Sequence, residues 1–334
     1  MLESIYLQAL EQCRPETLVH VPDDAPRDVV AIGKCAAALF RGVRKYDDAL
    51  VIVPEGYPGG DITGGHPEYT PASFAAGKQL LEFVDAHDDI LFLISGGGSA
   101  CVEWPLPGFT QEQLTKINHE LITSGKPIGE INAKRRKYSS IKGGRLGELV
   151  RGRAMALIYS DVSTGHLEDV ASGPVLKNMQ LIADNSTLVK AAAKIAGHAI
   201  VWEEQLECDV QEAAERLARA ARELRKGEVL VAGGEPTVKV HGNGKGGRCC
   251  ELAARFALQQ VRDVEALFAS SDGVDGNSGI AGAIIPANAA VDRHRIESQL
   301  DDSNSLAVVE MYGRAIMIPP TGNNLRDLVL LARA

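Results

Sequence analysis

The feature that most constrains the fold is a set of four short, almost wholly apolar runs in the first half of the chain. They cover residues 29–32, 49–53, 90–94 and 154–159. Segments with helical character separate them, for example residues 71–87, where a proline stands in the first turn. Runs that are apolar at every position are typical of strands buried on both faces of a parallel sheet. The first half therefore predicts an α/β domain built on a parallel sheet.

The second half predicts a separate, smaller α/β domain. The expected strands are residues 228–232, 237–240 and 266–269, and the expected helices are residues 180–196, 210–225 and about 251–261. A chain of 334 residues is long enough for two domains, each with its own core. We place the boundary so that the first domain covers residues 1–205 and the second covers residues 206–334.

Composition and charge exclude several classes of protein. The net charge is −9, whereas a non-specific nucleic-acid-binding protein would carry a basic face. No apolar run approaches the roughly 20 residues that span a bilayer, and residues 1–4 do not begin a signal peptide. The six cysteines form no C-x-x-C pair, which is typical of reduced thiols. We expect a cytoplasmic protein with no nucleic-acid or membrane partner.

Glycines and small polar residues cluster directly after the predicted strands. The loop Ser95-Gly96-Gly97-Gly98-Ser99 follows the strand over residues 90–94, and Gly33-Lys34 follows the strand over residues 29–32. Ligands of open α/β sheets bind where the carboxyl ends of strands meet loops and helix N-termini. Backbone N–H groups in a glycine loop can converge on an anion. We interpret the first loop as a phosphate site and Lys34 as a mobile positive charge beside it.

A second glycine-rich loop spans residues 242–248 and contains Lys245 and Arg248. Its glycines match G-x-G-x-x-G, but no acidic residue ends a strand about 20 positions later, so the dinucleotide fingerprint is weak. Its basic side chains suit phosphate or carboxylate better. The other basic cluster, residues 134–137, is interpreted as a solvated face, which is the usual role of a charge run.

Acidic residues and histidines follow other predicted strands. Asp161 comes after the strand over residues 154–159, and Asp272 comes after the strand over residues 266–269. Mg²⁺ bound with phosphates takes one or two protein carboxylates, so these two residues are candidate metal ligands. His66 and His166 lie in loops, and either is a candidate for substrate binding or for a general base.

Ten short motifs occur in a fixed order along the chain. They cover residues 33–34, 65–67, 94–100, 140–146, 160–162, 171–174, 233–238, 246–248, 271–273 and 320–322. In this order they resemble the glycerate 2-kinase family, also called the MOFRL family, over nearly the whole chain. Some members of that family carry hydroxypyruvate reductase names.

The resemblance implies a Rossmann-like N-terminal domain, a smaller α/β C-terminal domain and an active site in the cleft between them. It also implies ATP, a divalent cation and transfer of phosphate to the 2-hydroxyl of D-glycerate or a related small hydroxy acid. Lys34 would be the catalytic lysine and Arg248 the arginine of the cleft. The substrate-binding residues that it suggests are His66, Lys142, Arg145 and Asp161.

We therefore predict a phosphoryl transfer that depends mainly on positioning and charge neutralisation. The residues 95–99 loop, with Lys245, would bind ATP phosphates, and Lys34 would stabilise the transferred group. Arg248 would hold the substrate carboxylate or that same group, and Asp161 or Asp272 would bind Mg²⁺. The protein is expected to be a monomer or a homodimer.

Two alternatives stay open at this point. One is an NAD(P)-dependent hydroxypyruvate reductase, which rests on the glycine pattern of residues 242–247. The other is a non-catalytic protein that binds a phosphorylated metabolite. It is motivated by Cys249 and Cys250, where the family usually has asparagine and glutamine, and by the lack of an expected aspartate near Ser278.

Overall fold

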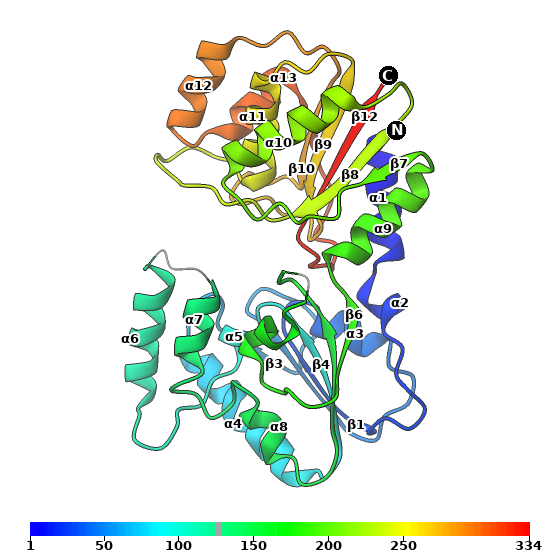
Figure 1. The fold of residues 1–334 in the computed structure, drawn as a ribbon. Coiled ribbons are helices and arrows are strands. Elements are labelled where there is room, and N and C mark those ends of the chain that lie inside the picture. The colour runs from blue at the N-terminus through cyan, green and yellow to red at the C-terminus, as the bar shows by residue number, and fades with distance from the viewer. Residues whose placement is uncertain (125–127, 164) are drawn as a thin grey trace. The chain divides into compact units, whose positions relative to one another are not determined.

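The computed structural model describes residues 1–124, 128–163 and 165–334 of the chain. These residues form two compact units (Figure 1). Residues 14–184 form one unit, which we call the parallel-sheet unit. Residues 1–13 and 185–334 form the other, which we call the mixed-sheet unit.

The parallel-sheet unit contains a six-stranded sheet in the order β3-β2-β1-β4-β5-β6, and every neighbouring pair is parallel. Its strands are β1 (Asp28–Ile32), β2 (Ala49–Pro54), β3 (Ile62–Gly64), β4 (Ile90–Ser95), β5 (Ala154–Tyr159) and β6 (Met179–Ala183). Its helices are α2 (Pro15–Leu18), α3 (Ala36–Arg41), α4 (Pro71–Ala86), α5 (Gly98–Cys101), α6 (Gln111–Ile122), α7 (Ile128–Arg135), α8 (Arg145–Leu149) and the 3-10 helix η1 (Leu167–Ser172). The predicted parallel sheet is confirmed, and β4 and β5 are buried at every position.

The strand order gives this sheet a topological switch point. The chain proceeds outward in one direction from β1 to β2 and β3, and in the other direction from β4 to β5 and β6. The loops after β1 and β4 therefore leave neighbouring strands toward opposite sides, which opens a crevice at their carboxyl ends. This is the Rossmann-like order, and it places the residues 33–34 and 95–99 loops at the switch point.

Local signals account for the helix that begins after β3. Pro71 stands at the first position of α4, and Thr70 precedes it as the N-cap. The Ser73 hydroxyl accepts hydrogen bonds from the N–H groups of Thr70 and Gly65, at 3.1 and 3.0 Å. A capping box of this kind satisfies N–H groups that a helix leaves unpaired at its start. The cap also holds the loop that carries His66.

The mixed-sheet unit contains a second six-stranded sheet, in the order β11-β10-β9-β12-β8-β7. Its strands are β7 (Ala199–Val201), β8 (Val229–Gly234), β9 (Val264–Ser270), β10 (Gly282–Ile285), β11 (Arg314–Ile316) and β12 (Asp327–Arg333). Its helices are α1 (Leu2–Gln12), α9 (Asn185–Ala196), α10 (Val210–Glu223), α11 (Arg248–Leu258), α12 (Arg293–Asp301) and α13 (Ser305–Tyr312). The β7–β8 pair is parallel and the other pairs are antiparallel.

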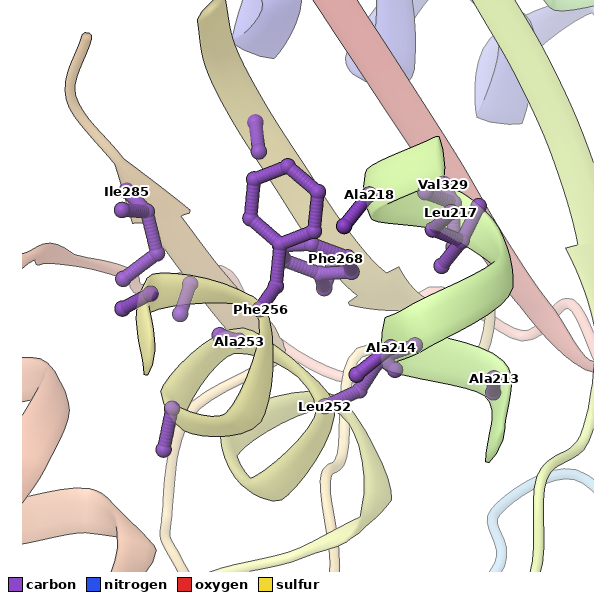
Figure 2. Packing of buried hydrophobic residues seen from close by; sticks show 14 of the residues in the cluster. Ala213, Ala214, Leu217, Ala218, Leu252, Ala253, Phe256, Phe268, Ile285 and Val329 are labelled. Carbon is purple, nitrogen blue, oxygen red and sulfur yellow. The ribbon is translucent and has the colours of Figure 1, made fainter. Parts of the chain in front are cut away.

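Small residues allow α10 and α11 to pack closely in the core of this unit. Ala213, Ala214, Leu217 and Ala218 lie on one face of α10 and are fully buried. Figure 2 shows this face near the side chains of α11, with Phe268 of β9 beside Phe256. Alanine-rich faces at helical spacing bury apolar surface without the volume of larger side chains.

The first helix belongs to the mixed-sheet unit, although β1 and the rest of the parallel sheet follow it in sequence. Leu2, Ile5 and Tyr6 of α1 are buried, and the Tyr6 hydroxyl donates a 2.6 Å hydrogen bond to the Ser270 carbonyl. The Asn323 side chain donates to the Leu10 carbonyl at 3.2 Å. Contacts across more than 260 residues of sequence thus attach α1 to β9 and to the loop before β12.

Three expectations from the sequence differ from the structure. Residues 237–240 do not form a strand: Val240 is 76% exposed, and the segment makes only an isolated bridge between Asp209 and Thr237. The start of the helix expected over residues 180–196 is strand β6, and the helix begins at Asn185. The compact units divide at residues 13 and 184 rather than at 205, because α1 and α9 pack with the mixed sheet.

Candidate active site

Most of the predicted site residues lie at the carboxyl edge of the parallel sheet. Lys34 follows β1, His66 follows β3, residues 95–99 follow β4, and Asp161 follows β5. The strands are parallel and adjacent, so these loops all leave the sheet at the same edge. Asp161 is half-buried there, directly after the buried Ser160.

The loops after β1 and β4 are joined at the switch point. The Lys34 backbone N–H donates to the Gly96 carbonyl at 2.8 Å. Gly33 has φ +115°, and a Cβ there would lie 2.4 Å from the Ser95 carbonyl oxygen. Only glycine permits this conformation and this approach. The Ser95 hydroxyl accepts from the Cys35 N–H at 3.0 Å and donates to the Ile32 carbonyl at 3.3 Å. The Ser95 hydroxyl therefore joins the two loops.

The side chains of Lys34 and His66 both lie beside Gly97. Its φ is +81°, and a Cβ on it would lie 2.9 Å from Cγ of Lys34 and 3.2 Å from Cδ2 of His66. Both side chains thus occupy the space that a side chain at position 97 would need. Among the described residues, Lys34 makes no ion pair with a carboxylate. Its ammonium is therefore available to an anion at the switch point.

His66 is uncharged at neutral pH in this environment. Partial removal of water from the ring, together with the positive charges of Lys34 and Arg135, lowers the pKa of His66 to about 4. Desolvation and nearby like charges both disfavour the imidazolium form. A neutral imidazole beside Lys34 can accept a proton from a hydroxyl group.

Ser99 belongs to a polar network that also includes a buried arginine. Its hydroxyl lies 2.7 Å from the Ser172 hydroxyl, which donates to Asn132 Oδ1 at 2.8 Å. Arg135 donates to Ser99 Oγ at 3.3 Å from Nη1 and to Asn118 Oδ1 at 2.9 Å from Nε. Arg135 is only 8% exposed, so the interpretation of residues 134–137 as a solvated face is wrong at this position.

Lys142 and Arg145, which the resemblance suggested as substrate-binding residues, both have partners within the parallel-sheet unit. Lys142 is 1% exposed, and its ammonium lies 2.6 Å from Glu103 Oε2. Arg145 donates from Nη1 to the carbonyl oxygens of Arg136, Ser139 and Lys142, the last two at 3.0 and 3.1 Å. These contacts fix the segment that follows Arg135, because they satisfy carbonyl groups that lie outside regular secondary structure.

His166 does not lie in the cluster formed by Lys34 and His66. It is exposed, and its Nδ1 is 3.5 Å from Glu168 Oε1. His166, Glu168 and Asp169 bring potential ligand atoms within 4.8 Å of one another, but Asp169 also forms an ion pair with Arg136 at 2.5 Å. The geometry favours His66 of the two histidines as the residue nearer to a phosphate site.

In the mixed-sheet unit, Arg248 is held by two carboxylates. Its Nη1 lies 2.8 Å from Glu235 Oε1, and its Nε lies 3.2 Å from Asp327 Oδ2. Burial opposes the charge of Arg248, but Asp327 and Glu235 outweigh this effect and raise its pKa. Burial raises the pKa of Asp327, and Arg248 opposes that rise. Arg326 also contacts Glu235, at 3.3 Å, so the cluster orients the Arg248 guanidinium from one side.

The second glycine-rich loop is built around contacts within its own unit. A Cβ on Gly244 would lie 2.5 Å from Asn304 Cβ, and one on Gly246 would lie 2.1 Å from Ser305 Oγ. Lys245 is exposed, and its backbone N–H donates to Asn304 Oδ1 at 3.2 Å. The glycines at 244 and 246 therefore allow the loop to pack against the start of α13.

A carboxylate already occupies the start of α11. The N–H groups of Cys249 and Cys250 donate to Asp275 Oδ1 and Oδ2, at 2.9 and 2.8 Å. In a dinucleotide fold, the N–H groups at this position bind the pyrophosphate. The G-x-G-x-x-G match at residues 242–247 is therefore not supported as a dinucleotide site.

Asp272 stabilises the turn after β9. Its Oδ1 accepts from the Ser270 hydroxyl at 2.8 Å and from the Val274 N–H at 2.9 Å. This is the side-chain to backbone pattern by which aspartate supports a turn. Its second carboxylate oxygen remains a candidate ligand for a cation.

The comparisons with known proteins agree with one another over most of the chain. The family model described as "Domain of unknown function (DUF4147)" matches residues 2–215, and that of the MOFRL family matches residues 228–327. The glycerate 2-kinase of Sulfurisphaera tokodaii is 30% identical, over 93% of this chain and 91% of that protein. The D-glycerate 2-kinase of Thermotoga maritima is 29% identical, over 90% of this chain and 89% of that protein.

The fold agrees as well. The crystal structure of the Thermotoga maritima glycerate kinase superposes with a TM-score of 0.88 at 27% identity, and covers 99% of this chain and 98% of that chain. The chain belongs to the glycerate 2-kinase family. As a member of the glycerate 2-kinase family, it is a phosphotransferase with an alcohol group as acceptor. Among the described residues, no helix has the length and apolar character that a membrane span requires.

For this glycerate 2-kinase relative, the structure adds residues that the sequence analysis missed. Arg135, Asn118, Asn132 and Ser172 connect the α6–α7 region and η1 to Ser99. The sequence signal for Arg135 is helical spacing, because it lies four residues after Ile131 and three after Asn132, both of which are buried. Among four consecutive basic residues, the sequence alone did not distinguish the inward one.

Proposed function

We propose that this protein is an ATP-dependent kinase that phosphorylates the 2-hydroxyl of D-glycerate or of a related small hydroxy acid. The observation that carries the proposal is the meeting of Lys34, His66 and Gly97 at the switch point of the parallel sheet. The names of the relatives support glycerate as the acceptor.

The residues at the switch point fit a phosphate group. Lys34 and Arg135 carry positive charge and have no carboxylate partner among the described residues. A buried or half-buried cation without a counter-charge is costly, and a bound anion removes that cost. Gly97 lies beside Lys34 and His66 and has no side chain that would separate its backbone from a ligand. These features support a role for residues 96–99 next to the ATP phosphates.

Each residue has a distinct proposed role in phosphoryl transfer. Lys34 stabilises the negative charge that spreads over the oxygens of the transferred group. His66, neutral at pH 7, accepts the proton of the attacking hydroxyl. Arg248, which Glu235 and Asp327 orient within the mixed-sheet unit, remains a proposed contact of the substrate carboxylate or of the transferred group. Lys245 remains a proposed phosphate contact because its side chain is exposed.

A divalent cation fits the chemistry of the available carboxylates. Asp161 lies at the carboxyl end of β5, and Asp272 keeps one oxygen beyond its turn contacts. When bound, Mg²⁺ would neutralise charge on the phosphate oxygens. We propose Asp161 or Asp272 as a protein ligand of the cation, each within its own unit.

The test is release of ADP from ATP and Mg²⁺ with a panel of small hydroxy acids that includes D-glycerate. Lys34→Ala is the test variant, and Lys78→Ala is its control, because Lys78 is an exposed residue of α4 that pairs with Glu82. Turnover of D-glycerate that Lys34→Ala loses and Lys78→Ala keeps is the expected result. Phosphorus NMR of the product then distinguishes the 2-phosphate from the 3-phosphate. A folded wild type without turnover on any acid would overturn the proposal.

The two rival functions have specific tests. The reductase requires a nicotinamide site, and the Asp275 contacts at the start of α11 argue against the one that the sequence offered. NADH fluorescence titration is expected to show no binding.

The binding-protein alternative requires ligand binding without turnover. Its motivating residues Cys249 and Cys250 are buried, and their backbone N–H groups donate to Asp275 at the start of α11. A cytoplasmic location and a monomeric or homodimeric state remain predictions.

A further inference from the structure

Two basic side chains are buried among the described residues, and one of them lacks a counter-charge. Lys142 is neutralised by Glu103 at 2.6 Å. Arg135 is 8% exposed, and no carboxylate lies within ion-pair distance of it in the described part of the chain. Removing a cation from water costs several kcal/mol unless a paired anion compensates for it. An arginine buried in this way is therefore poised for an anionic ligand.

The partners of Arg135 are neutral groups that fix its orientation. Nε donates to Asn118 Oδ1 at 2.9 Å, Nη1 donates to Ser99 Oγ at 3.3 Å, and the guanidinium carbon lies 5.9 Å from the centre of the Tyr69 ring. Among the described residues, these contacts leave N–H groups on both Nη atoms without an acceptor. A guanidinium held in one plane by its neighbours is preorganised to bind a carboxylate or phosphate with two hydrogen bonds.

A second unpaired donor lies in the same place. Asn118 is 1% exposed, and its Nδ2 has no hydrogen-bond partner among the described residues. The amide orientation is set by Arg135, because Oδ1 must face the Nε donor. A buried N–H group without an acceptor costs about 1–3 kcal/mol, so native structures seldom leave one unless a ligand or water fills the place.

We propose that Arg135 binds the carboxylate of the acceptor hydroxy acid and thereby selects acids over neutral alcohols. The inference rests on the proposed function and adds the residue that recognises the substrate. Ser99 contacts Arg135 within the loop that follows β4, so the proposed carboxylate site adjoins the proposed phosphate loop.

Charge and burial favour a carboxylate over a nucleotide phosphate at this position. A single buried guanidinium matches the one negative charge of a carboxylate. A nucleotide triphosphate carries several charges and would bring a hydrated Mg²⁺ with it. With 8% of Arg135 exposed, a small planar group can reach it more easily than a phosphate chain can.

The test separates recognition of the acid from catalysis. Arg135→Gln removes the charge, Arg135→Lys keeps the charge without the planar fork, and Arg151→Gln is the control. Arg151 belongs to the same unit but is exposed and pairs with Asp88 at 2.7 Å. For each variant, kcat and KM are measured for D-glycerate and for ATP, and calorimetry measures D-glycerate binding without ATP. D-Glyceramide serves as the neutral analogue.

The expected result is a rise of about 10- to 100-fold in KM and in the dissociation constant for D-glycerate with Arg135→Gln, in the range that one or two charge-assisted hydrogen bonds supply. Arg135→Lys should recover part of the loss. The values for ATP and for D-glyceramide should change less than about threefold, and Arg151→Gln should match the wild type. If Arg135→Gln is not folded, Arg135→Lys and Ser99→Ala are compared instead, with a smaller expected rise for D-glycerate alone.

The other outcomes separate the inference from the proposed function. Turnover of D-glycerate with unchanged KM in Arg135→Gln would overturn the inference and leave the kinase in place. A rise in KM for ATP alone would assign Arg135 to the nucleotide phosphates and overturn the carboxylate assignment. Arg135-dependent binding of D-glycerate without turnover would support the inference and overturn the kinase.

Discussion

The backbone N–H of Lys34 donates a 2.8 Å hydrogen bond to the carbonyl oxygen of Gly96, which fastens the loop after β1 to the loop after β4. The glycine loop therefore fixes the backbone of Lys34, from which the side chain extends. A change of side chain at residue 34 should leave this backbone contact intact. The lysine can thus be removed without dismantling the switch point.

The first prediction concerns the charge of Lys34. Lys34→Ala should lower kcat by about 100- to 1,000-fold, because a preorganised positive charge at the transferred group is lost. The melting temperature should change by less than about 2 °C, since among the described residues the ammonium makes no ion pair. Steady-state kinetics and thermal unfolding check both parts, with Lys78→Ala as the surface control. Equal kcat values for Lys34→Ala and Lys78→Ala would refute the role.

A second prediction separates backbone strain from crowding at Gly97. Gly97→Ala and Gly108→Ala both place alanine at positive φ, at +81° and +96°, and each should cost about 1–2 kcal/mol of unfolding free energy. Only at Gly97 would the new Cβ meet Lys34 and His66, because nothing lies within 4 Å of a Cβ at Gly108. Activity should fall in the first variant and persist in the second. Urea unfolding measures the loss of stability and initial rates measure the loss of activity, both on the same samples.

The third prediction tests the structural role of Lys142. Lys142→Met leaves Glu103 buried without its partner and should cost about 3–5 kcal/mol of unfolding free energy. The double variant Lys142→Met with Glu103→Leu should recover most of that loss, because both charges are then replaced by apolar groups. The folded double variant should have a KM for D-glycerate within a few-fold of the wild-type value. A large rise in that KM in a fully folded protein would return Lys142 to the substrate site.

The fourth prediction concerns pH. The folded pKa of His66, about 4, lies below the ordinary value of 6.5, so the unfolded chain binds more protons between these two values. The contribution of His66 to stability is therefore fully present above pH 6.5 and is lost as the pH falls toward 4. NMR titration should show the His66 ring signal, identified by its absence in His66→Gln, titrating near pH 4. A midpoint near 6.5 would contradict the combined effect of burial and of the positive charges of Lys34 and Arg135 on the pKa of His66.

The same titration reports on ligands. An anion bound to Lys34 or Arg135 offsets the positive charges that act on His66, so saturating D-glycerate or ATP should raise its pKa. An unchanged midpoint with ligand bound would mean that the anion lies away from this cluster.

The sequence predicted the parts of the site that follow apolar strands. Lys34 and residues 95–99 come directly after strands that are buried at nearly every position, and parallel pairing brings such loops to one edge. Arg135 could not be predicted in the same way. It lies in a run of four basic residues, and only the packing of α7 against its neighbours decides that this one is turned inward.

Some fold elements were ambiguous for physical reasons. Strand β6 is half-exposed and runs into α9 after a single residue, so its pattern merges with that of the helix. Residues 237–240 alternate as a strand would, but in the described part of the chain they form only the isolated bridge between Asp209 and Thr237. The resemblance to a family suggested Lys142 as a substrate residue, whereas its burial beside Glu103 is visible only in three dimensions.

The packing of α1 against the mixed sheet has a consequence for synthesis. A ribosome makes residues 1–13 first, yet the strands that bury Leu2 and Tyr6 are translated only after residue 228. The parallel-sheet unit is a single uninterrupted stretch, so all of its contacts are available as soon as residue 184 has emerged. The apolar face of α1 therefore stays uncovered in the nascent chain while the parallel-sheet unit folds. The mixed-sheet unit can bury this face only afterwards.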